Sequence, residues 1–478
     1  MSTFPTAQQL LGGKLVGSPR QSTSTSPADG AVLGTYADAS EAQAREAVEL
    51  ARAAFRETTW SRDRRLRHRV LNDIADAIER RTDEFVGLLA KENGKIVGEA
   101  GFELSLTPSK LRYYAGLALS DGGRAAEVAP GLHIRTVPEP IGVAGVIVPW
   151  NSPVVLSVRS FAPALAAGCT VVMKLPGQTG LVNGLLHQVL ADIDGLPAGV
   201  VNSLTESGDQ VAKYLVSSPD VDALSYTGST KVGRAIMAGA AGTLKRLTLE
   251  LGGKTPMLVF DDADLDAAVP VLTKAVTTFS GQFCMTGSRV LAQRGIADEL
   301  RARLSESLAA VKVGPGDDPA SEMGPMIDAA SARRVDGLVA AAAGYATVLV
   351  RGGLEGAEDS AHYRPSLVEV SDLDTPIVQQ EVFGPVATFE VFDTEADAIR
   401  LANATEYGLA ASVWSRDIDR PLRVGRELRA GTVWTNTWAV VVDQFEEGGF
   451  GQSGLGRLNG LRGLSEFQED KTYVQLLG

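Results

Sequence analysis

The sequence is poor in the side chains that cross-link a chain or bind metal ions. Among 478 residues there are only two cysteines, Cys169 and Cys284, and four histidines. Two cysteines cannot build a disulfide framework, and neither is spaced from a histidine or from the other cysteine as zinc ligands are. We therefore expect no disulfide scaffold and no metal site.

Long apolar runs and clusters of basic residues are also missing. No window approaches the roughly 18 uncharged apolar residues of a membrane span, and the N-terminal stretch lacks the basic and apolar regions of a signal peptide. With 45 basic and 58 acidic residues the net charge is −13, so the averaged field repels phosphate backbones and anionic lipids. We expect no nucleic-acid partner, no membrane partner and, by default, a cytoplasmic location.

Apolar residues, in contrast, are plentiful and follow an α/β pattern. They make up 44% of the chain, and the length corresponds to about three domains of roughly 150 residues. Between about residues 142 and 251, β-rich runs such as GVAGVIVPW, CTVVMKL and VDALSYTG alternate with helical stretches, which predicts a parallel sheet covered on both faces. The alternation begins again after Gly252, so we predict a second α/β domain. Near the N-terminus, Ser40 and Gln43 are spaced as a helix capping box.

Polar residues follow three of the predicted strands in the first α/β unit. These positions are Trp150 and Asn151, then Lys174, then Gly228 and Ser229. Ligands of open parallel sheets bind at the carboxyl ends of strands, and the run GSTKVG before a helix can offer backbone N–H groups to a pyrophosphate. The ordinary alternatives are a turn or a helix cap at GSTKVG, a turn at Asn151 and a solvated side chain at Lys174.

Two further residues carry reactive groups in unusual surroundings. Glu250 ends the run RLTLE before two glycines, where burial would raise its pKa and make it a general base. An exposed strand-end glutamate is the ordinary alternative. Cys284 lies in FSGQFCMTGSRV among glycines and small polar residues, although most intracellular cysteines are small buried hydrophobes. Asn151, in PWNSP, could be a simple turn former.

Taken together, these motifs resemble those of the NAD(P)-dependent, non-phosphorylating aldehyde dehydrogenase superfamily. The resemblance is carried by PWNSP, APALAAGCTVVMK, YTGSTKVG, LELGGKTP, GQFCMTGSRV, QQEVFGPV and GTVWTN. They occur in the family's order, and the flanking segments also resemble the family, so the match covers essentially the whole chain.

The resemblance implies oxidation of an aldehyde to a carboxylic acid. Cys284 would be the nucleophile, and the side-chain amide of Asn151 would stabilise the thiohemiacetal oxyanion. After hydride transfer to NAD or NADP, Glu250 would activate the water that cleaves the thioester. A thioesterase or esterase that uses the same cysteine, and a catalytically idle structural homologue, are the alternatives.

The resemblance also implies where the cofactor binds. Lys174 would contact the adenosine ribose, Gly228 and Ser229 would lie near the pyrophosphate, and Trp150, Glu381 and Phe383 would lie at the nicotinamide end. Many NAD-preferring members have a glutamate three residues after the lysine, but this chain has Gly177 there. A carboxylate at this position would repel the 2′-phosphate of NADP. Because this chain lacks it, we expect NADP to be tolerated.

The substrate pocket implied by the resemblance departs from the family pattern. Its expected residues are Ser152, Arg159, Phe283 and Trp438, and EEGG at 446–449 replaces the usual PFGG. Arg159 could hold a substrate carboxylate, as in semialdehyde-oxidising members, or form a structural salt bridge. We expect a medium-sized aliphatic, aromatic or semialdehyde substrate.

The domain organisation implied by the resemblance has three parts. A Rossmann-like dinucleotide-binding domain would comprise residues 1–121 and 141–251, and a catalytic domain residues 252–450. A β oligomerisation element would comprise residues 122–140 and 451–478, ending in the edge-strand-like run DKTYVQLLG. Because an unpaired edge strand favours a partner chain, we expect a homodimer or homotetramer.

Overall fold

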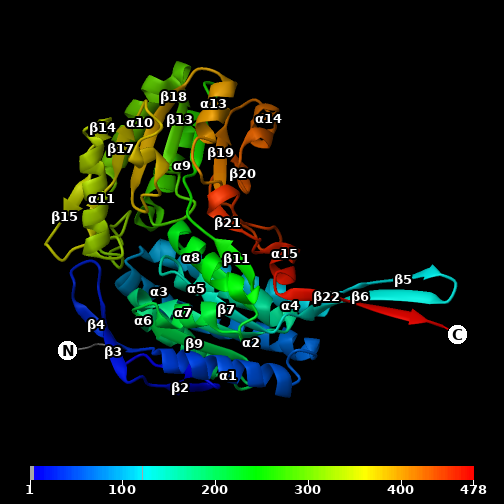
Figure 1. Ribbon diagram of the computed structural model, residues 1–478. Coiled ribbons are helices and arrows are strands. Elements are labelled where there is room, and N and C mark those ends of the chain that lie inside the picture. The colour runs from blue at the N-terminus through cyan, green and yellow to red at the C-terminus, as the bar shows by residue number, and fades with distance from the viewer. Residues whose placement is uncertain (1–4, 121, 478) are drawn as a thin grey trace.

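The computed structural model describes residues 5–120 and 122–477 (Figure 1). Residues 1–4, 121 and 478, which the predicted domain ranges include, lie outside the described residues. Two large sheets with helices around them form the body, and a narrow three-stranded sheet extends sideways from it (Figure 1). This architecture agrees with the predicted fold class.

The first large sheet has eight strands in the order β2-β1-β9-β8-β7-β10-β11-β21. Its parallel centre comprises β7 (Val143–Ile147), β8 (Thr170–Pro176), β9 (Val201–Glu206), β10 (Ala223–Thr227) and β11 (Arg246–Glu250). Antiparallel strands at the edges are β1 (Gln9–Leu11), β2 (Lys14–Val16) and β21 (Gly454–Leu455). The predicted β-α-β alternation is confirmed.

Side chains of this sheet alternate between two cores. Val171 and Met173 of β8 point into one core, and Val172 points into the other, as the two-residue period of a strand requires. The helices that contribute to these cores are α1 (Glu41–Glu57), α2 (Arg64–Arg80), α3 (Thr82–Leu88), α4 (Val97–Ser120), α5 (Pro153–Ala167), α6 (Gly180–Ala191), α7 (Gln210–Ser217) and α8 (Thr230–Ala240). Both faces of the sheet are therefore covered.

The N-terminal helices begin and end close to where the sequence predicts. Ser40 caps α1, and Gln43 completes the capping box through reciprocal hydrogen bonds of 3.3 Å. A π-helical turn, η1 (Leu89–Asn93), follows α3 and stops at Gly94, whose φ of +84° is readily adopted by glycine. The hairpin of β3 (Arg20–Thr25) and β4 (Val32–Asp38) and the long helix α4 were not predicted.

The second large sheet has seven strands in the order β14-β17-β18-β13-β12-β19-β20. Only β14 pairs antiparallel. Its strands are β12 (Pro256–Val259), β13 (Arg289–Gln293), β14 (Thr347–Val350), β17 (Ser366–Glu369), β18 (Val386–Phe392), β19 (Ala410–Trp414) and β20 (Thr432–Thr435). Around it lie α9 (Leu265–Thr277), α10 (Ala297–Ala310), α11 (Ala329–Ala342), α12 (Pro376–Gln379), α13 (Glu395–Ala402), α14 (Arg420–Glu427) and the hairpin of β15 (Gly353–Glu355) and β16 (His362–Arg364). The second α/β unit is thus confirmed.

The projecting sheet consists of β5 (Arg124–Ala129), β6 (Leu132–Pro140) and β22 (Gln468–Leu476). β22 pairs only with β6, so the predicted C-terminal edge strand is confirmed. Other parts of the C-terminal segment lie elsewhere: β21 pairs with β11, and α15 (Gly460–Ser465) contacts α5. The division into three domains, and the role of this sheet in assembly, stay predictions.

Membrane-spanning helices and metal sites are two features that the sequence is not expected to contain. In residues 5–120 and 122–477, no helix is long and apolar enough to span a bilayer. Across the same ranges, no group of histidine, cysteine, aspartate and glutamate side chains is arranged to hold a metal ion.

Candidate active site

One cavity of about 1360 Å³ lies where the carboxyl ends of the first sheet face loops of the second unit. It is lined by all thirteen residues predicted for catalysis, cofactor binding and substrate binding: Trp150, Asn151, Ser152, Arg159, Lys174, Gly228, Ser229, Glu250, Phe283, Cys284, Glu381, Phe383 and Trp438. The structure therefore brings together residues that are far apart in the chain; Arg159 and its ion-pair partner Glu447, for example, are 288 positions apart.

Two adjacent glycines after β11 explain how three parts of the site meet. A Cβ atom on Gly252 would lie 2.5 Å from Glu381 Oε2, and one on Gly253 would lie 2.3 Å from the Cys284 carbonyl oxygen. No side chain fits at these distances. The Gly253 N–H also donates to Glu381 Oε1 at 3.1 Å. The glycine pair thus holds the end of β11, the Cys284 loop and Glu381 against one another.

The loop that carries Cys284 begins with a left-handed turn. Phe279, Ser280 and Gly281 have φ values of +53°, +55° and +68°. Such a conformation is costly for a bulky residue such as phenylalanine, so it persists only where the surroundings hold it. The Ser280 hydroxyl donates to the Gly324 carbonyl at 2.7 Å, which ties the turn to a distant segment.

Asn151 is buried beside this loop. Its Nδ2 donates to the Gln282 carbonyl at 3.0 Å. A side-chain amide has two N–H groups, so the second one remains for a ligand in the cavity. The simple turn-former interpretation therefore does not account for its position next to the nucleophile loop.

The Cys284 thiol is enclosed by the site. Burial raises its pKa to about 12; the positive charge of Arg159 opposes this increase, and Glu447 and Glu250 add to it. The thiol is therefore protonated near neutral pH in the absence of ligands.

Glu250 is buried, so the interpretation as an exposed strand-end residue is wrong. Burial raises its pKa to about 8, while Arg159 and Arg457 oppose the increase. Its Oε1 is buried and has no hydrogen-bond partner in the described structure. A carboxyl group of this kind can exchange a proton close to neutral pH.

Arg159 is engaged by protein groups and is not free to bind a ligand carboxylate. Its Nη1 pairs with Glu447 Oε1, and its Nη2 donates to Thr227 Oγ1 at 2.8 Å. Both partners of the ion pair are buried. The structure therefore contains the salt bridge that was one of the two alternatives. Sequence reasoning missed Glu447, although the replacement of PFGG by EEGG was the available signal.

At the proposed nucleotide end of the cavity, Lys174 lies within the last part of β8 and Ser229 follows β10. Burial lowers the pKa of the Lys174 ammonium, while the Glu206 and Asp209 carboxylates oppose the decrease. Ser229 caps α8 by accepting the Val232 N–H at 3.4 Å, so the helix-cap interpretation is confirmed. The N-terminus of α8 nevertheless lines the cavity, where its backbone N–H groups and dipole suit an anion.

Gly177 and Gly228 are both in contact with tyrosine hydroxyls. A Cβ at Gly228 would lie 2.2 Å from Tyr226 Oη, so the Tyr226 ring occupies the space that a side chain would need at this position. A Cβ at Gly177 would lie 2.4 Å from Tyr36 Oη and 3.0 Å from Ser207 Cα. The family's ribose-binding glutamate therefore does not fit at Gly177 unless Tyr36 moves.

Glu381 is half-buried and lines the cavity together with the aromatic pair of Trp150 and Phe383. The two rings meet edge to face with centroids 5.5 Å apart. Burial raises the pKa of Glu381 to about 7, and the Gly253 N–H and Lys254 oppose the increase. The carboxyl group is thus available to either donate or accept a hydrogen bond.

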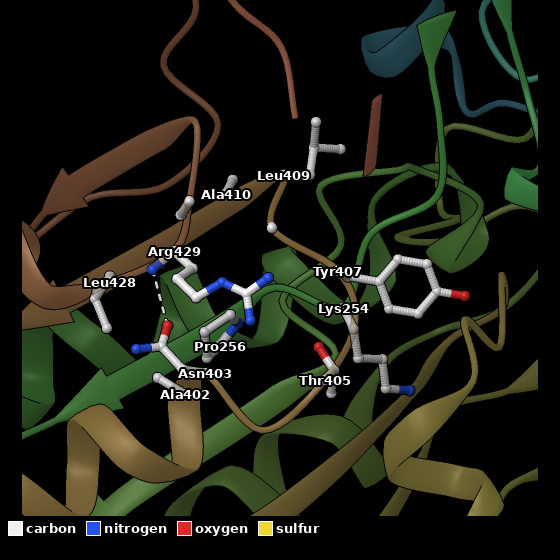
Figure 2. A pocket seen from close by; sticks show the side chains of 13 residues that line it. Lys254, Pro256, Ala402, Asn403, Thr405, Tyr407, Leu409, Ala410, Leu428 and Arg429 are labelled. Atoms are coloured by element: carbon white, nitrogen blue, oxygen red, sulfur yellow. Dashed lines mark hydrogen bonds between the residues drawn. The ribbon is translucent and has the colours of Figure 1, made fainter. Parts of the chain in front are cut away.

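Lys254 lies behind Glu381 in a separate, very small cavity. Figure 2 shows its side chain beside Tyr407 and Thr405, and the cavity volume is only about 10 Å³. Burial lowers the pKa of Lys254 to about 7, the charge of Arg289 adds to the decrease, and Glu390 opposes it. The cavity is too small for a substrate, and the Lys254 and Glu381 charges influence each other's pKa.

At the substrate end, an aromatic wall surrounds the approach to Cys284. Phe283 meets Phe279 and Trp438 edge to face, with centroid distances of 5.6 and 5.8 Å. Trp438 is fixed by a 2.8 Å hydrogen bond from its indole N–H to the Met285 carbonyl. Opposite, Ser152 Oγ accepts from Lys95 Nζ at 3.0 Å. The wall itself is apolar, and the cations Lys110 and Lys274 also line the cavity.

Comparisons with known proteins agree with this geometry. The aldehyde dehydrogenase family matches residues 16–473. Betaine aldehyde dehydrogenase of Bacillus subtilis (strain 168) is 38% identical over 445 residues, covering 92% of this chain and 91% of that protein. Succinate-semialdehyde dehydrogenase of Paenarthrobacter nicotinovorans is 37% identical over 450 residues, covering 94% and 98%.

A solved structure shows the same fold. The crystal structure of betaine aldehyde dehydrogenase from Staphylococcus aureus, in complex with NAD+, superimposes with a TM-score of 0.95 at 34% identity. The superposition covers 98% of this chain and 94% of that one.

The chain therefore belongs to the aldehyde dehydrogenase family. Three predictions are confirmed: the family resemblance indicated by the motifs, the α/β fold class, and the enzyme class, which is NAD(P)-dependent aldehyde oxidation. A thioesterase or a catalytically idle homologue is not favoured.

Proposed function

We propose that the aldehyde is oxidised at Cys284, with Asn151 and Glu250 in supporting catalytic roles. The observation that carries this proposal is that one cavity is lined by Cys284, by Lys174 and Ser229, and by the aromatic residues Phe279, Phe283 and Trp438. The cavity lining at Gly228, the N-terminus of α8 and the Glu381 carboxyl group fit a dinucleotide. When bound, NAD or NADP supplies the hydride acceptor.

The residues of the chain account for the remaining chemistry. The Cys284 thiol loses its proton to solvent water, and its sulfur forms a bond to the aldehyde carbon as the C=O π electrons move onto the oxygen. The free N–H of Asn151 and the Cys284 backbone N–H stabilise the oxyanion. Once the carbon has lost its hydride, a thioester remains. Glu250 takes a proton from water, whose oxygen attacks the thioester carbon, and the carbon–sulfur bond breaks to release the carboxylic acid.

For the cofactor we propose that NADP is accepted as well as NAD. No carboxylate occupies position 177, and the contacts of Gly177 with Tyr36 and Ser207 exclude one. The side chain of Lys174 remains at the adenosine end as a cation that can attract a 2′-phosphate.

For the substrate we propose an uncharged, medium-sized aromatic or aliphatic aldehyde. The wall of Phe279, Phe283 and Trp438 offers apolar contact, and the guanidinium of Arg159 is already paired with Glu447. A carboxylate tail would find no free arginine here. We also propose that the sheet of β5, β6 and β22 joins copies of the chain into a dimer or tetramer.

The test is a kinetic screen of the purified enzyme. We expect absorbance at 340 nm to rise when benzaldehyde or hexanal is mixed with NAD or NADP, and to rise more slowly with succinic semialdehyde at equal concentration. Cys284→Ser is the control and should abolish the signal. A signal from Cys284→Ser equal to that of the wild type would overturn the assignment of the nucleophile, and a clear preference for succinic semialdehyde would overturn the substrate class.

A further inference from the structure

We propose that Glu447 is a positioning residue for the general base: by pairing with Arg159, it keeps that guanidinium from forming a direct salt bridge with Glu250. The inference rests on the proposed role of Glu250 in thioester hydrolysis. It assigns a function to a cavity-lining residue outside the proposed set of reacting groups.

The segment that carries Glu447 packs against Glu250, the proposed base. A Cβ on its neighbour Gly448 would lie 3.0 Å from Glu250 Oε1, so this segment runs against the carboxyl group. Reciprocal backbone hydrogen bonds of 2.9 and 3.0 Å between Glu447 and Leu458 fix the segment beside β21. The Glu447 carboxylate therefore reaches Arg159 from a rigid support.

Neither of the two arginines near Glu250 donates a hydrogen bond to it. Arg159 uses Nη1 for Glu447 and Nη2 for Thr227, and its buried Nε has no partner in the described structure. Arg457 donates to the Gly456 carbonyl at 2.7 Å. The orphaned Oε1 of Glu250 and the orphaned Nε of Arg159 thus share a buried region without being bonded to each other.

The groups that face Glu250 come from three elements. They are Arg159 on α5, Glu447 and Arg457 on either side of β21, and Cys284 on the nucleophile loop. Burial raises the pKa of Glu250, the two arginines oppose the increase, and Glu447 adds to it. With Glu447 present, the positive charge of Arg159 is shared between two carboxyl groups.

Loss of the Glu447 charge releases Arg159. The freed guanidinium then pairs with Glu250, which lowers the pKa of that carboxyl group and holds it away from the hydrolytic water. Loss of the Arg159 charge has the opposite effect, because Glu250 is then left beside an unpaired carboxylate. The two single substitutions should therefore move the base in opposite directions.

The experiment measures the pH dependence of deacylation in Glu447→Gln and Arg159→Met by stopped-flow absorbance. We expect Glu447→Gln to move the apparent pKa of deacylation down by at least one pH unit and to slow deacylation at its plateau at least tenfold, visible as a larger burst before the steady state. We expect Arg159→Met to move the apparent pKa up. General loss of structure would lower rates without moving the two pKa values in opposite directions.

Two further variants keep the outcome interpretable. The double variant Arg159→Met with Glu447→Gln leaves no unpaired buried charge and should return the apparent pKa toward that of the wild type. Glu250→Gln tests the base itself: if it leaves deacylation unchanged, the proposed role of Glu250 is wrong. If Glu250→Gln stops deacylation while both single variants keep the wild-type pKa, or move it the same way, the positioning role of Glu447 is overturned.

Discussion

Glu99 of α4 accepts the backbone N–H of Phe279 at 2.8 Å, at the first residue of the left-handed turn that leads to Cys284. The Lys95 ammonium lies 3.9 Å from the centre of the Phe279 ring. Helix α4 therefore stabilises the strained start of the Cys284 loop through Glu99, which is not one of the proposed reacting groups.

Loss of the hydrogen bond between the Phe279 N–H and Glu99 should lower the catalytic efficiency without removing a proposed reacting group. We expect Glu99→Ala to lower kcat/KM about tenfold, because the turn loses the acceptor that offsets its strain. Burial raises the pKa of Glu99 to about 7, so the site already tolerates a neutral side chain. Glu99→Gln keeps an acceptor oxygen and should retain most of the activity. Steady-state kinetics of both variants provide the check, and equal losses in the two would contradict the role of the hydrogen bond.

The oxyanion role of Asn151 predicts a loss in kcat. We expect Asn151→Ala to lower kcat about 100-fold, which corresponds to roughly 3 kcal/mol of transition-state stabilisation. Cofactor binding, measured by fluorescence or calorimetry, should be unchanged, because Asn151 faces the Cys284 loop. A variant with normal kcat would remove Asn151 from the reacting centre.

The pKa of Cys284 predicts how alkylation depends on pH. Because burial raises this pKa to about 12, the thiolate fraction of the ligand-free enzyme should increase about tenfold per pH unit between pH 7 and 10, without a plateau. The measurement is the rate of iodoacetamide labelling at Cys284, followed by peptide mass spectrometry. Cys169, which is fully buried, is the internal control and should stay unlabelled. A plateau below pH 9 would show that the free enzyme already holds a thiolate.

The contacts of Gly177 predict the choice of cofactor. We expect kcat/KM values with NAD and NADP to differ by less than about a hundredfold, a gap of under roughly 3 kcal/mol. Gly177→Glu should weaken binding of both cofactors instead of producing an NAD-specific enzyme, because the new side chain meets Tyr36 Oη. Gly208→Glu, at a glycine with open space around its Cα, is the matched control for adding a carboxylate nearby. A wild-type preference for NAD above a hundredfold would contradict the expectation.

Much of the site could be predicted because its residues lie in local motifs. The strand ends that carry Asn151, Lys174 and Glu250 follow from alternating β-rich and helical runs, and parallel sheets bring such ends to one edge. The cysteine was conspicuous because its neighbours are small and polar. These features depend on a few consecutive residues, so the sequence contains them directly.

The supporting residues could not be predicted in the same way. Glu99 and Phe279 are separated by 180 positions, and Arg159 and Glu447 by 288, so each contact exists only once the two α/β units have come together. Helix α4 was missed because Pro108 lies inside it and its apolar residues do not form one clear stripe. Burial of Glu250 likewise depends on β21, a two-residue strand from the far end of the chain.

The geometry of the whole site depends on the absence of side chains at Gly252 and Gly253. One methyl group added at either position would press on Glu381 or on the Cys284 carbonyl, and the end of β11 is part of the same short connection. The proposed nucleophile Cys284, the proposed base Glu250 and Glu381 are therefore positioned by the same short segment, and a change there would misalign all three. Directed evolution of this enzyme should start from the aromatic wall and leave this junction untouched.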